Sequence, residues 1–143
     1  MNVNVGDVVP AFVRQTEFAN WNRYAAVNDE FVPIHMDDEA GAAAGNGGAF
    51  GMGNLQWAYL HNMLRDWMGP NGTILSMEVQ FRSINHKNQI VSAKGVVTAV
   101  DGDVVTLDVW TEQQEGTKLA PGTATVRLPK NSTYMPFAIS TCD

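Results

Sequence analysis

The chain has 143 residues, which fits one domain of ordinary size, and its net charge of −6 argues against nucleic acid or an anionic membrane surface as a main partner. Its one cysteine, Cys142, cannot form an internal disulfide, so we expect a cytoplasmic protein. We expect neither a secretory signal nor a membrane span, because no apolar run has the length or flanking charges that these need.

Residues 1 to about 70 are predicted to form helices and loops. A first helix is expected over residues 17–27, and Thr16 can cap its beginning. This helix cannot continue through the next segment, because Pro33 lacks an N–H and pushes the residue before it out of the helical region.

Two more helices are predicted further along this half. Residues 37–44 can form a short helix, which a glycine-rich stretch then ends. Residues 53–68 carry apolar side chains at helical spacing and should form the longest helix, buried on most sides. These apolar residues are Leu55, Tyr59, Leu60, Met63, Leu64 and Trp67.

The second half, residues 73–128, alternates between apolar and polar residues as strands do. Leu75, Met77, Val79 and Phe81 are expected on one face of the first strand. Two strands, 91–100 and 104–110, should be joined by a hairpin turn at Asp101-Gly102, and 123–128 should be the last strand. Because the strands and the apolar helix would each expose an apolar face alone, they should pack together in one α+β domain.

The segment from Tyr24 to His35 contains two carboxylates, Asp29 and Glu30, ahead of a proline turn and a histidine. Histidine is the usual proton-transfer group near neutral pH, and with a carboxylate it could activate a water molecule. These residues alone leave another interpretation open, in which His35 packs near a loop and the two carboxylates are solvated or cap a turn.

This segment resembles the hydratase motif of the MaoC-like dehydratases, also called (R)-specific enoyl-CoA hydratases. The matching residues are Tyr24, Ala25, Phe31, Pro33, Ile34 and His35. The resemblance spans about residues 7–128. We therefore expect a single domain of residues 1–143, in which 129–143 form a C-terminal tail. It implies a hotdog fold, in which a long antiparallel sheet wraps around a central helix. It also implies that His35 and Glu30 activate water, with Asp29 as the rival carboxylate.

A second point of resemblance is Ala49-Phe50-Gly51-Met52-Gly53, at the start of the longest helix. The family has His-Gly-Met here, so Gly51 and Met52 match and Phe50 replaces the histidine. A helix N-terminus favours negative charge, and the resemblance implies that the Gly51 N–H stabilises a thioester oxyanion. The alternative is a simple glycine-rich loop before a helix.

The resemblance also implies that CoA arrives as part of the substrate, with no metal and no other cofactor. Arg82 and Lys87 follow a Phe-Arg element like that of the family and are candidates to contact the CoA phosphates, with Met52 also expected in the CoA thioester site. The alternative is that this segment is a solvated strand end.

The implied reaction is syn addition of water across a trans-2-enoyl-CoA, which gives an (R)-3-hydroxyacyl-CoA. Val32 suggests a bulky acyl group such as a steroid side chain, and the expected assembly is a homodimer or a hetero-oligomer with a second hotdog subunit. A non-catalytic supporting subunit is the main alternative, because Glu30 and Phe50 depart from the family pattern. A thioesterase is less favoured, because residues 53–60 contain no carboxylate.

Overall fold

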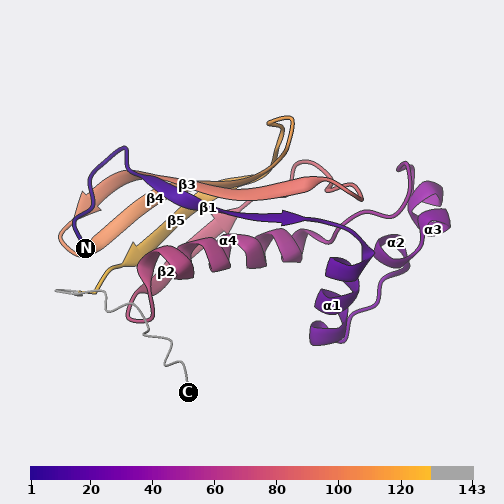
Figure 1. Ribbon diagram of the computed structural model, residues 1–143, viewed down its shortest axis with the longest axis horizontal. Coiled ribbons are helices and arrows are strands. Elements are labelled where there is room, and N and C mark those ends of the chain that lie inside the picture. The colour runs from indigo at the N-terminus through magenta and orange to yellow at the C-terminus, as the bar shows by residue number, and fades with distance from the viewer. Residues whose placement is uncertain (130–143) are drawn as a thin grey trace, which may run out of the picture.

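A computed structural model of the chain describes residues 1–129 and shows a five-stranded antiparallel sheet curved around one long helix (Figure 1). The predicted tail of residues 129–143, with Cys142, lies outside the described residues except for its first residue. The elements are β1 (Val8–Gln15), α1 (Phe18–Asn28), α2 (Pro33–Met36), α3 (Asp38–Ala43), α4 (Gly53–Met68), β2 (Thr73–Val79), β3 (Ile90–Asp101), β4 (Val104–Gln113) and β5 (Lys118–Arg127). Within residues 1–129, no helix is long and apolar enough to cross a membrane.

The strands are arranged in the order β1-β3-β4-β5-β2, so β1 and β2 form the two edges of the sheet. The turn between β3 and β4 contains Gly102 with a φ of 61°, a backbone conformation that glycine adopts without steric cost. The predicted hairpin at this position is confirmed. Val104 pairs with Asp101 across the same turn, which sets the register of β3 and β4.

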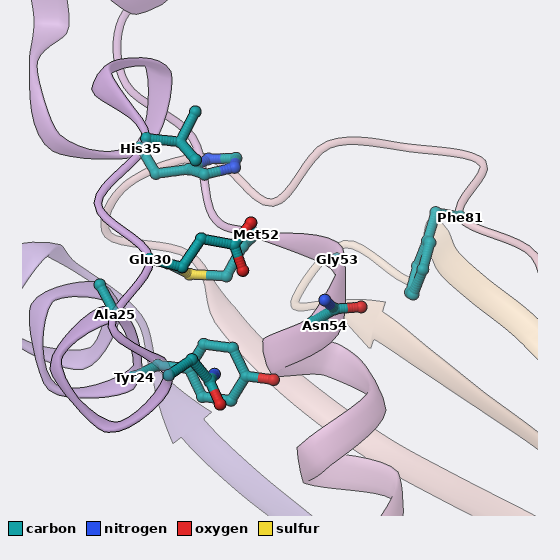
Figure 2. Close-up of a pocket in the computed structure, with 10 residues that line it drawn as sticks. Tyr24, Ala25, Glu30, His35, Met52, Gly53, Asn54 and Phe81 are labelled. Atoms are coloured by element: carbon teal, nitrogen blue, oxygen red, sulfur yellow. The ribbon is translucent and has the colours of Figure 1, made fainter.

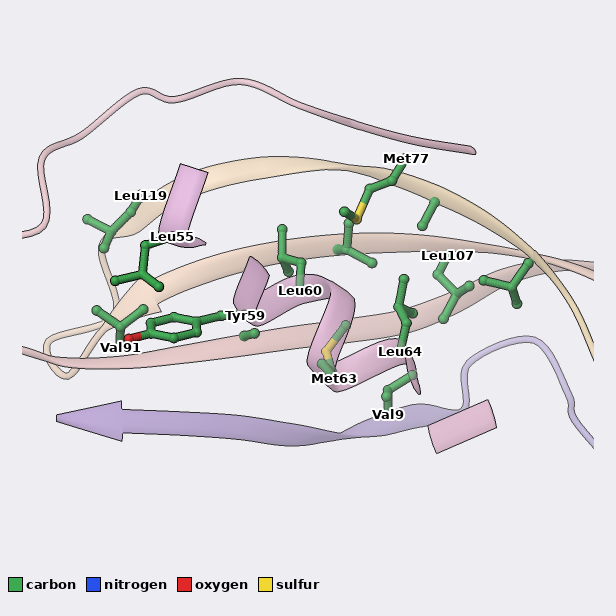
Figure 3. Close-up of a cluster of buried hydrophobic side chains, with 14 of the residues drawn as sticks. Val9, Leu55, Tyr59, Leu60, Met63, Leu64, Met77, Val91, Leu107 and Leu119 are labelled. Atoms are coloured by element: carbon green, nitrogen blue, oxygen red, sulfur yellow. The ribbon is translucent and has the colours of Figure 1, made fainter. Parts of the chain in front are cut away.

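The helix α4 lies against the concave face of the sheet, and its apolar side packs with inward-facing strand residues to form the core. It begins at Gly53 and ends at Met68, as the apolar spacing predicts. Figure 3 shows Leu60, Met63 and Leu64 within this core, where each is at most 1% exposed. Burying each such side chain contributes about 1.5–3 kcal/mol. The prediction of burial on most sides is confirmed, because the exposed residues, Asn62 and Arg65 among them, form one narrow polar side.

The strand β1 was not predicted, since the first half of the chain was expected to hold only helices and loops. It pairs antiparallel with β3, and a register shift between Val9 and Phe12 interrupts the alternation of its side chains. Pro10 lies within this shift. A proline that cannot donate to a ladder is tolerated at a bulge in an edge strand, so the strand forms without the usual sequence pattern.

The predicted face of β2 is also partly wrong. A register shift between Ile74 and Ser76 moves Leu75 out of the alternation, and Leu75 is 43% exposed. Phe81 lies beyond the end of the strand and is 51% exposed. Met77 does face the core, as predicted.

Helices α1, α2 and α3 lie together at one end of the sheet, beside the N-terminal end of α4 (Figure 1). Thr16 does not cap α1 as predicted. Its buried hydroxyl donates to the Gln89 carbonyl at 2.8 Å, while the Glu17 N–H donates to the Asn20 side chain at 2.9 Å. The helix α2 was not predicted. Pro33 starts it, because proline fits the first turn of a helix, where its missing N–H is not needed.

Candidate functional site

A pocket of about 240 Å³ lies between α1, α2 and the start of α4. Figure 2 shows the side chains of His35 and Glu30 directed into it from one side, with Asn54 at the first turn of α4 on the other. Met52 and Phe81 also line the pocket. The fold therefore brings two parts of the chain with chemically active groups to one cavity.

His35 lies on α2 and is held by the backbone of the segment that precedes α4. Its Nδ1 lies 2.6 Å from the Phe50 carbonyl oxygen. Because a carbonyl can only accept, Nδ1 donates the proton, and in the neutral ring Nε2 keeps its lone pair. The Phe50 ring meets the imidazole edge to face, with ring centroids 5.0 Å apart. The half-buried His35 therefore presents Nε2 as a proton acceptor.

The end of α1 decides which carboxylate accompanies His35. Asp29 adopts a left-handed conformation with a φ of 52°, which turns the chain, and the Glu30 N–H then donates to the Ala25 carbonyl at 3.0 Å. Glu30 lines the pocket, whereas Asp29 is not among its lining residues. The structure thus places Glu30 rather than Asp29 in the same pocket as His35.

A carboxylate outside the pocket ties together the segments that hold His35. One oxygen of Asp38 accepts from the Ala49 N–H at 3.0 Å, and the other pairs with Lys87 Nζ at 2.7 Å. The hydrogen bond from Lys87, and then that from Ala49, lowers the pKa of Asp38. The Lys87 ammonium is paired with Asp38 and lies over the Phe18 ring, and Lys87 does not line the pocket, so its contact with CoA phosphates stays a prediction.

The Gly51 N–H is not free to stabilise an oxyanion, which corrects the prediction. It donates to the Asn85 carbonyl at 2.8 Å. A Cβ at Gly51 would lie 2.8 Å from Trp21 Nε1, so packing alone excludes a side chain here. The free amides are those of Gly53 and Asn54, because the first N–H groups of a helix have no acceptor within it. Neither donates to another group within residues 1–129, and both residues line the pocket.

A second cavity of about 190 Å³ adjoins the first and shares His35, Gly53 and Phe81 with it. A Cβ at Gly53 would lie 3.0 Å from the Phe81 ring, so this ring rests on the start of α4, where the two cavities meet. Arg82 lines the second cavity and donates to the Gln80 side chain at 2.6 Å. Of the two predicted phosphate contacts, Arg82 therefore lies near His35 and Lys87 does not.

No protein-family model and no curated protein matches this sequence. Solved structures do match the fold. The (R)-hydratase from A. caviae involved in PHA biosynthesis aligns with a TM-score of 0.82 at 23% identity, over 89% of this chain and 98% of that chain. The ChsH1–ChsH2 complex from Mycobacterium tuberculosis aligns with a TM-score of 0.82 at 22% identity, over 90% and 100%. R-hydratase PhaJ1 from Pseudomonas aeruginosa aligns with a TM-score of 0.82 at 17% identity, over 96% of this chain and 93% of that chain. The chain has a hotdog fold. At these identities the likeness establishes the fold, and the site residues must carry any argument about function.

One polar residue of this hotdog domain was missed by the sequence reasoning. Gln56, in the first turns of the central helix, is only 3% exposed and lines the second cavity. The signal was a single glutamine between Leu55 and Trp57 on a helix face that is otherwise apolar. Among residues 1–129, no group of three or more histidine, cysteine, aspartate or glutamate side chains is placed to hold a metal ion.

Proposed function

We propose that this chain is an (R)-specific enoyl-CoA hydratase of the MaoC-like dehydratase family. The observation that carries the proposal is the shared pocket of His35 and Glu30 at the start of the central helix, where the His35 ring is fixed with Nε2 free. The reaction adds water syn across a trans-2-enoyl-CoA and gives an (R)-3-hydroxyacyl-CoA.

The His35–Glu30 pair holds the reacting water. As the oxygen of this water bonds to C3, the pair accepts one of its protons and returns a proton to C2 on the same face, which makes the addition syn. The electrons of the double bond pass towards the thioester carbonyl, whose oxygen becomes an enolate. The Gly53 and Asn54 N–H groups stabilise that charge, because fixed donors act strongly where charge develops.

The substrate carries its own CoA, and Arg82 is the residue proposed to contact an anionic part of it. Met52 lines the first pocket and is proposed to contact the thioester arm. The resemblance at Val32, which lines the same pocket, is the ground for a further proposal that the acyl group is bulky, such as a steroid side chain. A short and a bulky enoyl-CoA therefore belong in the same assay.

The proposed assembly is a homodimer or a complex with a second hotdog subunit. The edge strands β1 and β2 support this proposal, because edge strands offer unpaired backbone groups to another chain. Val8 on β1 is 75% exposed. The ChsH1–ChsH2 complex gives a precedent for two subunits in one structure with this fold.

A non-catalytic supporting subunit is the second candidate. The observation that favours it is the hydrogen bond from the Gly51 N–H to Asn85, which occupies the amide that the family uses for the oxyanion. In this case the chain would bind an active hotdog partner and leave catalysis to it.

The deciding experiment is hydration of trans-2-butenoyl-CoA and of a steroid side-chain enoyl-CoA, followed by loss of the enoyl thioester ultraviolet absorbance. His35→Ala should lower turnover by about 10²- to 10⁴-fold, the usual contribution of a general acid or base. His61→Ala is the matched control, because the Trp57 carbonyl holds its Nδ1 in the same way at 2.9 Å but it lines neither cavity. A folded wild-type protein that hydrates neither substrate would instead favour the supporting-subunit function.

A further inference from the structure

The burial of Gln56 requires an explanation, because a buried amide is unfavourable unless its polar atoms are hydrogen-bonded. One of the two polar atoms of the Gln56 amide has a hydrogen-bond partner on β4. The Thr111 hydroxyl donates to Gln56 Oε1 at 2.5 Å, and Thr111 itself is fully buried. This bond uses the amide oxygen and leaves the two hydrogens of Nε2 for another acceptor.

The surroundings of Gln56 Nε2 can be inferred by elimination, from the buried polar atoms that have no hydrogen-bond partner. Within residues 1–129, the only buried side-chain polar atoms without a partner are Nε1 of Trp21 and Nε1 of Trp110. No hydrogen bond from Gln56 Nε2 is present in this part of the chain either, so Nε2 must reach accessible space. The accessible space beside Gln56 is the second cavity, which His35 and Gly53 also line.

We propose that Gln56 is a catalytic residue whose Nε2–H donates to the thioester carbonyl oxygen of the substrate. This inference rests on the proposed hydratase function. It gives the enolate a side-chain donor in place of the Gly51 amide, which Asn85 already occupies. Gly53 supplies a second donor to the same space, since it lines both cavities.

The chemistry of the step needs only a neutral donor at this place. When the hydroxyl bonds to C3, the electron pair of the C2–C3 bond moves to form the enolate, and the proton then bonds to C2 and restores the carbonyl. Gln56 gains and loses no proton in this sequence. Thr111 is a positioning residue, because it acts on the substrate only by orienting the glutamine amide.

The test uses three variants that separate the donor from its anchor. Gln56→Leu combined with Thr111→Val removes both polar partners together, which is close to neutral for folding because neither is left unsatisfied. Thr111→Val alone keeps the donor and loses only its orientation. Gln56→Glu keeps an acceptor for the Thr111 hydroxyl but replaces the donor with a carboxylate. Thermal melts of all three variants establish that they fold.

The expected loss in kcat for trans-2-butenoyl-CoA is about 10²- to 10³-fold in the double variant, as for removal of one oxyanion donor elsewhere. Gln56→Glu should lose at least as much, because its charge repels the enolate, and Thr111→Val should lose less. A folded double variant with wild-type kcat would overturn the role of Gln56 and leave the hydratase function standing.

A second measurement separates this inference from the hydratase function. Butanoyl-CoA labelled with ¹³C at the carbonyl has no double bond to hydrate, so its infrared carbonyl band reports contact alone. The band should shift to lower frequency on the wild-type protein, and the shift should be smaller in the double variant, which keeps only the backbone donor of Gly53. A shift that depends on Gln56, in a protein that hydrates nothing, would support the contact and reject the hydratase. Failure to bind the thioester would overturn both.

Discussion

Replacing Gly41 with alanine should disturb the pocket that holds His35 and Glu30 without changing any residue that lines it. Gly41 lies in α3, and a Cβ there would be 2.0 Å from the Gly48 carbonyl oxygen and 2.5 Å from the Ala49 nitrogen. Both are backbone atoms, which cannot rotate away. The segment from Gly48 must therefore retreat by about 1 Å or more to reach normal contact, and it leads directly to Phe50, whose carbonyl holds His35.

The size of the effect comes from two opposing contributions. Alanine is more favourable than glycine inside a helix by about 1 kcal/mol. Overpacking against a structure that cannot yield costs about 1–3 kcal/mol, and this contact is close enough to expect the upper end. The net loss should be about 2 kcal/mol, which lowers the melting temperature of a chain of this length by about 7 °C. Turnover should fall by about 10- to 100-fold, because a displacement of about 1 Å can cost that much.

The assay is a thermal melt together with hydration of trans-2-butenoyl-CoA. Gly47→Ala is the matched control, because a Cβ at Gly47 would meet nothing within 4 Å. The control should keep wild-type stability and turnover. A Gly41→Ala protein that melts at or above the wild-type temperature and turns over normally would refute the reasoning, because it would mean that α3 does not fix the segment before Phe50.

Two further predictions concern carboxylates. Glu30→Gln should lower kcat by about 10²-fold or more, whereas Asp29→Asn should leave it near wild type, because only Glu30 lines the pocket; the reverse ranking in the hydration assay would reassign the pair. The pKa of Asp38 is lower in the folded protein than its ordinary value of 3.8, so its ion pair with Lys87 stabilises the fold above pH 3.8. This stabilisation is lost as the pH falls through the lowered pKa of the folded state. Denaturant unfolding of wild type and Asp38→Asn should therefore differ at pH 7 and converge in acid; a difference that persists at the lowest pH would contradict this origin.

The elements that the sequence predicts best are those with strong local signals. The helix α4 has apolar residues at helical spacing over its whole length and glycines at both ends, so its bounds could be predicted. The hairpin at Gly102 was likewise predicted from a local signal, the Asp-Gly pair between two alternating segments. The strand β1 could not be predicted, because Pro10 and a bulge break its alternation and its pairing partner β3 lies far along the chain.

In the candidate site, too, the residues within one local motif could be predicted and the long-range pairings could not. His35 and Glu30 stand within one short segment, so a local motif was enough to single them out. The Gly51 N–H is hydrogen-bonded to the Asn85 carbonyl, and Lys87 forms an ion pair with Asp38. In both cases the two partners are distant in sequence. Such pairings are set by tertiary packing, and nothing in the local pattern of either segment indicates them.

Phe50 stands where the motif of the MaoC-like dehydratases has a histidine, and this difference should not weaken the proposed base, His35. The group that holds His35 is the Phe50 carbonyl, a main-chain atom that any residue at this position supplies. The Phe50 N–H in turn donates to the Ile34 carbonyl at 3.2 Å, so the two segments are tied by backbone alone. The side chain adds an apolar edge against the imidazole. The pairing of the Gly51 N–H with the Asn85 carbonyl does have a chemical consequence, because an active enzyme must then obtain its oxyanion donors from Gly53 and the residues that follow it on α4.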